Sequence, residues 1–199
     1  MNEIKLFGRW DTSQIQVNDV GLRDYINLDQ VYIPKRCGRN ASNRFWKSKY
    51  NIIERLINKM MVPGHRGKKH KITSGKCTGK YNTVYCLIIK SFDIIEKEMK
   101  VNPIEIFIKA VENAAPREEI TAIEYGGARY PQAVECSPQR RIDLVLRQMV
   151  QGSYSASFNK KKRIERCLAD EIMKAYRCDQ GSQAITKKLE LERQADSSR

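Results

Sequence analysis

The stretch from Pro116 to Arg141 constrains the fold most, because it predicts a β-hairpin between segments that predict helices. Gly126 and Gly127 lie at its centre. Two adjacent glycines suit a two-residue hairpin loop, whose backbone requires positive φ angles at which a Cβ atom would clash. We therefore expect two antiparallel strands that are joined by this pair.

A loop at this pair fixes which residues face each other across the predicted hairpin. Ile123 then faces Tyr130 and Glu124 faces Arg129, which gives an apolar pair and a pair of opposite charge. Pro131 lacks an amide donor and so indicates an edge strand or a bulge. Since an isolated two-stranded hairpin is marginally stable in water, we expect its base to pack on the helices and its tip to reach outward.

Three helices are predicted before the hairpin. Apolar residues at helical spacing follow Tyr50 and, after a glycine-rich linker, Val84. Asn102 and Pro103 then provide an N-cap and a proline at the first helical position of the third helix, which Pro116 ends.

Three further helices are predicted after the hairpin. Pro138 starts the first of them, with Gly152 as a plausible C-terminal cap. The basic run 159–163 opens the next, although cations at a helix N-terminus oppose the macrodipole, which suggests that they face an anionic partner. The last spans about Ser182 to Ala195 and is only thinly apolar, so its end is expected to need a partner for order.

The predicted fold class is mainly α, a bundle of about six helices with one protruding hairpin, residues 117–136. Residues 1–48 are expected to form an extended basic arm that needs a surface to lie on. Residues 49–199 are expected to form a helical domain with an inserted loop, residues 62–80. The longest apolar run, Val84 to Ile89, is too short to span a bilayer.

Positive charge is concentrated in one part of the chain. The net charge is +14, and residues 35–80 hold fourteen Lys and Arg against one acid, Glu54, which gives +13. Such a concentration is self-repulsive unless a polyanion neutralises it. Nucleic acid is the first candidate, while a merely soluble basic surface and an anionic membrane surface are the alternatives. Phe45 and Trp46 lie within this segment, where they either stack on RNA bases or cap the core.

The sequence gives little support for an enzymatic active site or a metal-binding site. Six cysteines have no C-x-x-C spacing and indicate reduced thiols, and no cofactor is expected. His65, His70 and Cys77 match no zinc pattern well, and the glycine-rich loop that holds both histidines cannot position a general base. The neighbours Glu118 and Glu119 would point to opposite faces of a strand, so they cannot easily share a catalytic cation.

Several short motifs, in order along nearly the whole chain, resemble the universal small-subunit ribosomal protein seven family. The N-terminal residues 5–10 and 18–20 look like its eukaryotic cytosolic branch, small-subunit protein five. The motifs are Asn58-Lys59-Met60-Met61, Gly79-Lys80, Asn102-Pro103, Pro116-Arg117-Glu118, Gln132-Ala133-Val134, Ser137-Pro138-Gln139-Arg140-Arg141, Cys167-Leu168-Ala169-Asp170-Glu171 and Ala184-Ile185-Thr186-Lys187-Lys188.

The resemblance implies a structural protein without enzymatic activity. Such proteins bind the 3′ major domain of the small-subunit rRNA, support head assembly, and lie where mRNA leaves the E site beside tRNA, toward which their hairpin reaches. Their usual protein neighbour is protein eleven of the platform. The implied location is the cytoplasmic ribosome, after nucleolar passage during assembly.

The candidate RNA-binding residues combine these patterns with the charge clusters. Reversing the charge of Arg140 and Arg141 is expected to impair assembly and to leave the helical fold intact. The full set is Lys35, Arg36, Arg39, Arg44, Lys47, Lys49, Lys76, Lys80, Arg129, Tyr130, Arg140, Arg141, Arg147, Lys160, Lys161, Lys162, Arg163, Lys187 and Lys188.

The chain departs from the family pattern at two places. Tyr81 follows Gly79-Lys80 where the family has a third basic residue, and about eleven extra residues precede this motif. At the hairpin, eukaryotic relatives usually carry arginines where this chain has Ala122, Tyr125, Tyr130 and Pro131. Arg129 and the tyrosine rings are left as the candidate RNA-facing groups of the tip.

Two other functions share parts of this sequence pattern. A DNA-binding or chromatin protein would have a similar net charge, and equal competition by duplex DNA would favour it. A metal-dependent nuclease would use Glu118, and cleavage abolished by Glu118→Ala would support it.

Overall fold

The structure, a computed structural model, describes residues 4–38, 42–64 and 79–199. Within these residues it contains seven α-helices, one 3-10 helix and one two-stranded sheet, so the mainly α prediction is confirmed. The elements are α1 (Val20–Arg23), the 3-10 helix η1 (Trp46–Lys49), α2 (Ile52–Met60), α3 (Tyr81–Met99), α4 (Pro103–Ala114), β1 (Glu118–Tyr125), β2 (Ala128–Glu135), α5 (Pro138–Ser157), α6 (Ile164–Tyr176) and α7 (Gln183–Asp196).

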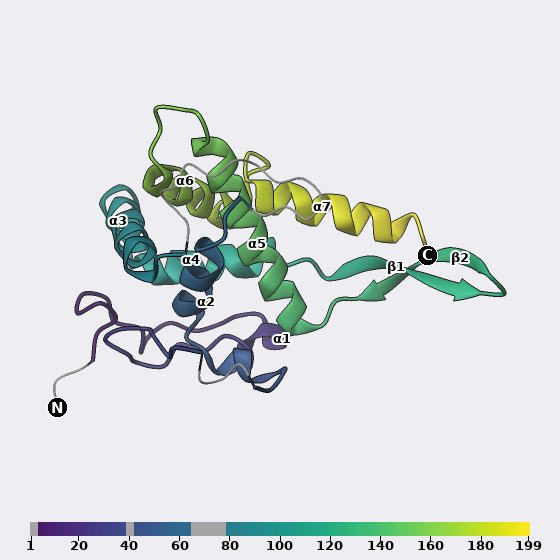
Figure 1. Cartoon of the computed structure of the whole chain (residues 1–199), viewed down its shortest axis with the longest axis horizontal. Coiled ribbons are helices and arrows are strands. Elements are labelled where there is room, and N and C mark those ends of the chain that lie inside the picture. The colour runs from purple at the N-terminus through teal and green to yellow at the C-terminus, as the bar shows by residue number, and fades with distance from the viewer. Residues whose placement is uncertain (1–3, 39–41, 65–78) are drawn as a thin grey trace.

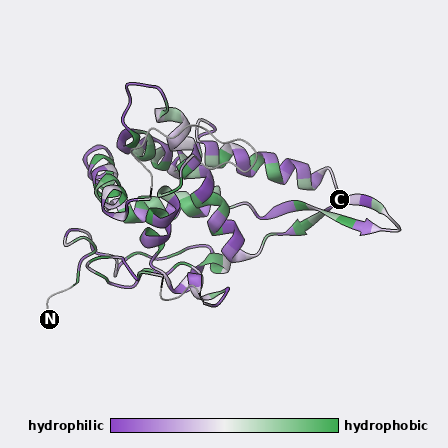
Figure 2. Cartoon of the chain, in the orientation of Figure 1, coloured by the Kyte–Doolittle hydropathy of each residue, from purple (hydrophilic) through white to green (hydrophobic). Residues whose placement is uncertain are grey.

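Helix α6 packs against α3, α4 and α5 (Figure 1). Its buried side chains include Leu168 and Ile172, which join the hydrophobic core. Hydrophobic and hydrophilic residues alternate along the helices (Figure 2), as expected of amphipathic helices that bury one face. In the described part of the chain, no helix is both long and apolar enough to cross a bilayer.

Local start signals place most helices where the sequence predicts them. The Asn102 side chain accepts a hydrogen bond from the Ile104 amide and caps α4, whose first residue is Pro103. The basic run 159–163 behaves differently from the prediction, because it forms the loop between α5 and α6. Helix α6 begins only at Ile164, with the backbone of Arg163 as its N-cap.

Gly152 is not a C-terminal cap, because α5 continues five residues beyond it to Ser157. A Cβ atom at this position would lie 3.0 Å from the Cβ of Gln183 and 3.2 Å from the carboxyl carbon of Glu171. The missing side chain therefore lets α5 approach α6 and α7. Glu171 fills the space and accepts hydrogen bonds from the Ser182 hydroxyl (2.8 Å) and the Ala184 amide (3.1 Å), which caps α7.

We expect Gly152→Ala to destabilise the protein, although alanine favours a helix by about 1 kcal/mol over glycine. Glu171 is 7% exposed, and burial raises its pKa, so the buried carboxyl has little room to yield to a methyl group. Displacing this cap should outweigh the helix propensity and lower the free energy of unfolding by roughly 1–2 kcal/mol. Urea unfolding measures the change, and an unchanged or increased stability would contradict the packing argument.

The N-terminal segment lies along one side of the helical bundle and shares its core (Figure 1). Leu6 and Leu22 are fully buried and Trp10 is 4% exposed. The Trp10 indole donates to Glu96 of α3 (3.1 Å), and its ring lies edge-on to Phe92 at 5.7 Å. The surface on which the N-terminal segment lies is therefore provided by the helices of the same chain.

The hairpin has the predicted register, with Ile123 opposite Tyr130 and Glu124 opposite Arg129. Both loop glycines have positive φ angles, 59° at Gly126 and 80° at Gly127. The strands project beyond the helices, and α7 runs beside their base (Figure 1). Residues 118–120 are half-buried and residues 121–132 are exposed, which confirms a packed base and a projecting tip.

Candidate nucleic-acid interface

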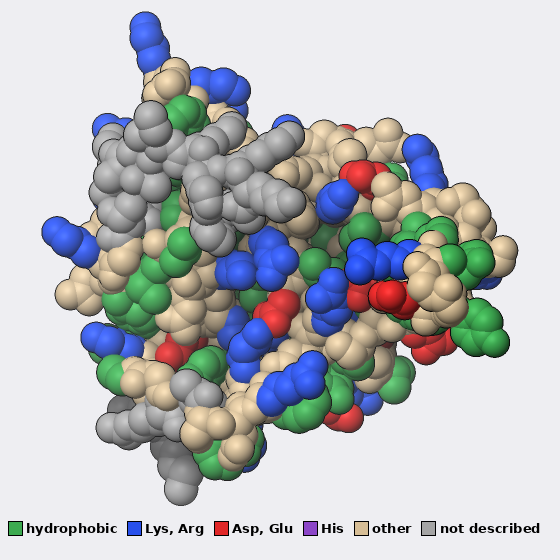
Figure 3. Space-filling view, turned by 45° about the vertical axis from the view of Figure 1, so that its right-hand side comes forward, with side chains coloured by type: hydrophobic (Ala, Val, Ile, Leu, Met, Phe, Trp, Pro, Cys, Tyr) green, Lys and Arg blue, Asp and Glu red, His purple; other side chains and the backbone are tan. Residues whose placement is uncertain are grey.

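A hollow of about 240 Å³ opens on the basic face of the molecule, between η1, α2 and α5. Four cationic side chains and one carboxylate line it, and Lys and Arg side chains gather broadly over this face (Figure 3). The lining residues are Lys47, Tyr50, Arg55, Asn58, Lys59, Asp143, Leu146 and Arg147.

Asp143 of α5 organises two of these cations. Its Oδ1 accepts from the Arg55 guanidinium at 3.1 Å, and its Oδ2 pairs with the Lys47 ammonium. The Arg55 side chain is only 3% exposed, and its buried Nε has no hydrogen-bond partner among the residues that the structure describes. Burial lowers the pKa of Arg55, and Asp143 opposes that shift. With one acid against four bases, the hollow keeps an excess of positive charge.

Lys59 and Arg147 carry two of these positive charges. Burial lowers the pKa of Lys59, and repulsion by Arg147 adds to the shift. Two cations held close together in a partly desolvated hollow are unfavourable without a counter-charge. A phosphate group would relieve the repulsion and could accept charge-assisted hydrogen bonds from both side chains.

Phe45 and Trp46 lie at the surface and do not cap the core, since their exposed fractions are 62% and 38%. A cation lies over each ring, Arg44 at 5.6 Å from the Phe45 centroid and Lys49 at 5.1 Å from the Trp46 centroid. Rings and cations combined in this way suit contact with nucleotides, because bases stack on the rings and phosphates pair with the cations.

The basic segment is fastened to α2 and α3 near residues 34–36. Glu54, the only acid between residues 35 and 80, is 3% exposed and accepts a hydrogen bond from the Arg36 amide (2.7 Å). Burial raises the pKa of Glu54, and the Arg36 contact opposes the shift. The Tyr81 hydroxyl donates to the Pro34 carbonyl (2.6 Å), and Lys35 lies over the Tyr81 ring. Tyr81 therefore anchors this part of the basic segment.

Arg140 and Arg141 lie in different environments. Arg140 is exposed and pairs with Glu119 at 2.5 Å. Arg141 is buried, and its guanidinium donates to the Pro116 carbonyl (3.0 Å) and to Asp19 Oδ2 (2.7 Å). The expectation that Arg141 is a phosphate contact is therefore corrected: its guanidinium is directed inward and serves the fold.

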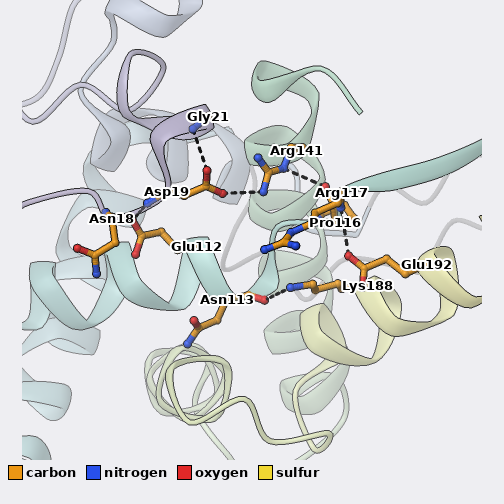
Figure 4. A network of polar contacts seen from close by, with 10 residues as sticks. All are labelled: Asn18, Asp19, Gly21, Glu112, Asn113, Pro116, Arg117, Arg141, Lys188 and Glu192. Carbon is orange, nitrogen blue, oxygen red and sulfur yellow. Dashed lines mark hydrogen bonds and ion pairs between the residues drawn. The ribbon is translucent and has the colours of Figure 1, made fainter. Parts of the chain in front are cut away.

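The Arg141 contacts belong to a network at the base of the hairpin (Figure 4). Glu112 of α4 accepts from the backbone amides of Asn18 (2.5 Å) and Asp19 (3.1 Å), which holds the N-terminal segment. Helix α7 contributes two bonds, from Lys188 to the Asn113 carbonyl (2.8 Å) and from the Arg117 amide to Glu192 (3.1 Å). Together these bonds join the N-terminal segment, α4, α5 and α7 at the point where β1 begins.

The remaining predicted cations divide into free and paired side chains. Lys162 pairs with Asp170 (3.0 Å) and Lys187 pairs with Glu190 (2.9 Å), while Lys188 belongs to the network above. Among the residues that the structure describes, no acidic side chain lies within ion-pair distance of Lys160, Lys161 or Arg163, which are exposed. Arg129 of the hairpin pairs with Glu124 at 3.7 Å.

Some predicted residues lie outside the described part of the chain. These are Arg39, Lys76 and the histidine-containing loop residues His65, His70 and Cys77. The described residues hold no group of three or more His, Cys, Asp or Glu that could bind a metal ion. Glu118 and Glu119 pair with different arginines, Glu118 with Arg199 (2.5 Å) and Glu119 with Arg140, as expected of neighbours on opposite faces of a strand.

Sequence reasoning missed Arg55, Lys59 and Asp143 as members of the site. Arg55 and Lys59 are four residues apart and so share one face of α2, a signal that is visible in the sequence. Asp143 joins them only through the packing of α2 against α5, which the sequence does not reveal.

A family model and individual relatives indicate the same protein family for this chain. Residues 22–199 match the family model described as ribosomal protein S7p/S5e. A protein of Nanoarchaeum equitans named small ribosomal subunit protein uS7 is 55% identical over 197 residues, 99% of this chain and 100% of that protein. A protein of the same name from Methanothermobacter thermautotrophicus is 45% identical over 192 residues, 96% of this chain and 97% of its own length.

Proposed function

The chain belongs to the ribosomal protein S7p/S5e family, whose matched relatives are small-subunit proteins, and on that premise we propose that it binds the 3′ major (head) domain of the small-subunit rRNA. In this role it neutralises rRNA phosphates and supports assembly of the head. The role is structural and involves no reaction. Its location is the ribosome.

The hollow between η1, α2 and α5 is the observation that carries this proposal. Its cations Lys47, Arg55, Lys59 and Arg147 are held on helices, so their geometry is set before RNA arrives. The exposed rings of Phe45 and Trp46 lie in and next to η1, which borders the hollow, and would add stacking beside the phosphate contacts.

The proposed partners other than rRNA are based on the hairpin and on the family resemblance. The hairpin projects beyond the helices (Figure 1). The proposed partners near it are the mRNA and the E-site tRNA, and the proposed protein neighbour is protein eleven of the platform. Nucleolar passage would apply only in a eukaryotic cell, whereas the two relatives described above are archaeal.

The experiment that tests this function has two measurements. First, the chain should co-sediment with small subunits through a high-salt wash. Second, its affinity for the head-domain rRNA fragment should fall steeply with salt, by roughly 0.7–0.9 log units per phosphate contact for each log unit of salt.

Two results would contradict the proposal. One is a salt-insensitive affinity for the rRNA fragment. The other is equal competition by random duplex DNA, which would indicate a general DNA-binding protein. Addition of Mg²⁺ should cause no cleavage of the fragment, and the variant Glu118→Ala serves as the control for that measurement.

A further inference from the structure

Asp143 is an acidic residue within a cationic hollow. Among the described residues that line the hollow between η1, α2 and α5, it is the one carboxylate beside four cations. A carboxylate repels the phosphate that those cations attract, so charge alone makes Asp143 unfavourable for RNA binding. Both of its oxygens are nevertheless engaged by cations of the same lining. These two contacts give Asp143 a role in the geometry of the site.

Arg55 fixes the Asp143 carboxylate from the inside of the fold. One terminal nitrogen of its guanidinium donates to Asp143 Oδ1 and the other donates to the Tyr25 carbonyl, each at 3.1 Å. The Arg55 side chain is 3% exposed, so the guanidinium has little freedom to move. A buried guanidinium that loses its acid is strongly destabilising, which keeps this pair together. Oδ1 of Asp143 is thus anchored to the interior of the fold.

The second oxygen of Asp143 holds Lys47, which comes from η1. The Lys47 side chain is 42% exposed and remains accessible to a ligand, whereas Arg55 is buried. An unpaired lysine side chain samples many rotamers, and a ligand that fixes it must offset the lost entropy. The ion pair with Asp143 restricts Lys47 before any ligand binds. It also ties η1, which begins at Trp46, to α5.

Asp143 and Lys47 both lie within electrostatic reach of Lys59. Burial lowers the pKa of Lys59, and repulsion by Arg147 adds to the shift. Attraction by Asp143 opposes it, and repulsion by Lys47 adds a smaller part. Three cations gathered at one place repel one another and would separate in the free protein. The carboxylate offsets part of that repulsion, so it allows Lys47 to stay beside the other two cations.

We propose that Asp143 is a positioning residue of the RNA interface, which holds the Lys47 ammonium where it meets a phosphate group together with Lys59. This inference rests on the proposed function, because it concerns the same hollow and the same rRNA. Its consequence is opposite to what net charge predicts. A negatively charged side chain raises the affinity of this protein for a polyanion, since it lowers the entropy cost of placing a flexible cation.

Filter binding to the head-domain rRNA fragment at several salt concentrations tests the proposal. Asp143→Asn retains an amide oxygen for Arg55 but removes the charge that holds Lys47. Its affinity should fall by about 2- to 10-fold, the cost of ordering one flexible side chain, although the protein gains net positive charge. The salt dependence should keep its slope, because Lys47 is still present and still neutralises a phosphate.

Lys47→Gln distinguishes a positioning residue from a contact residue. This variant removes the phosphate contact itself, so both the affinity and the slope should fall, the slope by about 0.7–0.9. When Asp143→Asn is added to Lys47→Gln, no further weakening is expected, because no ammonium is left to position. A residue that only supports the fold would weaken binding equally in both backgrounds.

Two further variants complete the experiment. Asp93→Asn removes the same charge from an ion pair with Arg9 (2.8 Å) outside the hollow, and its carboxylate has a similar exposure, 32% against 29% for Asp143. It should not weaken binding. Arg55→Met combined with Asp143→Leu replaces the buried pair by apolar side chains without a change in net charge, which is often neutral for stability. It should weaken binding like Asp143→Asn, and it provides the test if the asparagine variant does not fold.

The outcomes separate this inference from the proposed function. If Asp143→Asn binds the fragment as tightly as the unsubstituted protein, or more tightly, the inference is overturned. Equal weakening by Asp143→Asn in the presence of Lys47→Gln would also overturn it, because the effect would then not pass through Lys47. If the unsubstituted protein itself binds the fragment without salt dependence, the proposed function fails instead.

Discussion

Arg141→Gln is expected to lower the free energy of unfolding by about 3 kcal/mol, because it leaves a partly buried carboxylate and a buried carbonyl without their donor. The Arg141 side chain is 11% exposed and Asp19 is 29% exposed, so solvent can replace only part of the lost interaction. Urea unfolding of the isolated protein measures the change.

The neighbouring residue gives a matched control. Arg140→Gln removes an arginine from the same helix turn, but the Arg140 side chain is 54% exposed, against 11% for Arg141, so its pair with Glu119 is screened by solvent and should contribute less, about 1 kcal/mol. Reversing the charge of both arginines would therefore remove a surface charge at Arg140 and also disrupt a buried contact at Arg141. The sequence-based expectation of an intact fold applies to Arg140 alone.

The pH dependence should distinguish the ion pair from a packing effect. Burial tends to raise the pKa of Asp19, but Arg141 holds it below its ordinary value of 3.8. A carboxyl whose pKa is lower in the folded state than in the unfolded state stabilises the fold at pH values above its unfolded-state pKa. That stabilisation is lost as the pH falls through the folded-state pKa. The difference between Arg141→Gln and the unsubstituted protein should therefore narrow below about pH 3.8. A constant difference would contradict the ion-pair assignment.

The second large effect is expected in the hollow. Lys59→Gln combined with Arg147→Gln should weaken binding to the head-domain rRNA fragment on the order of tenfold or more, since a charge-assisted hydrogen bond contributes roughly 1.5–3 kcal/mol. The salt dependence should also become shallower, by about 0.7–0.9 in the logarithmic slope for each contact removed. Filter binding at several salt concentrations measures both quantities.

The stability of this double variant should not fall together with its affinity for RNA. Burial lowers the pKa of Lys59 and repulsion by Arg147 adds to the shift, so removing both charges relieves an unfavourable pair in the free protein. The unfolding free energy should be unchanged or higher. Lys97→Gln, on the exposed side of α3 and outside the hollow, is the control for general charge loss. Equal weakening by this control would contradict a specific phosphate site.

Local sequence signals determined much of the fold. The Gly126-Gly127 pair set the register of the hairpin because a two-residue loop leaves one pairing of the strands, and that register is confirmed. Asn102 and Pro103 set the start of α4 because N-capping depends on the few residues around the first turn. The concentration of charge in residues 35–80 likewise depends on sequence alone and indicated a polyanionic partner.

Tertiary packing decided the features that depend on distant segments. Arg140 and Arg141 are indistinguishable in sequence, yet only Arg141 meets Asp19, which lies 122 residues away. In the sequence Gly152 resembles a helix cap, but in the structure it is the position at which α6 and α7 pack against α5. The hollow requires η1 and α2 to meet α5, so its cations became a site only through the fold. The sequence by itself thus determined most of the longer helices and where charge lies, because these follow from neighbouring residues. The tertiary structure alone decided which charges are buried and which remain free, because burial depends on what packs above each side chain.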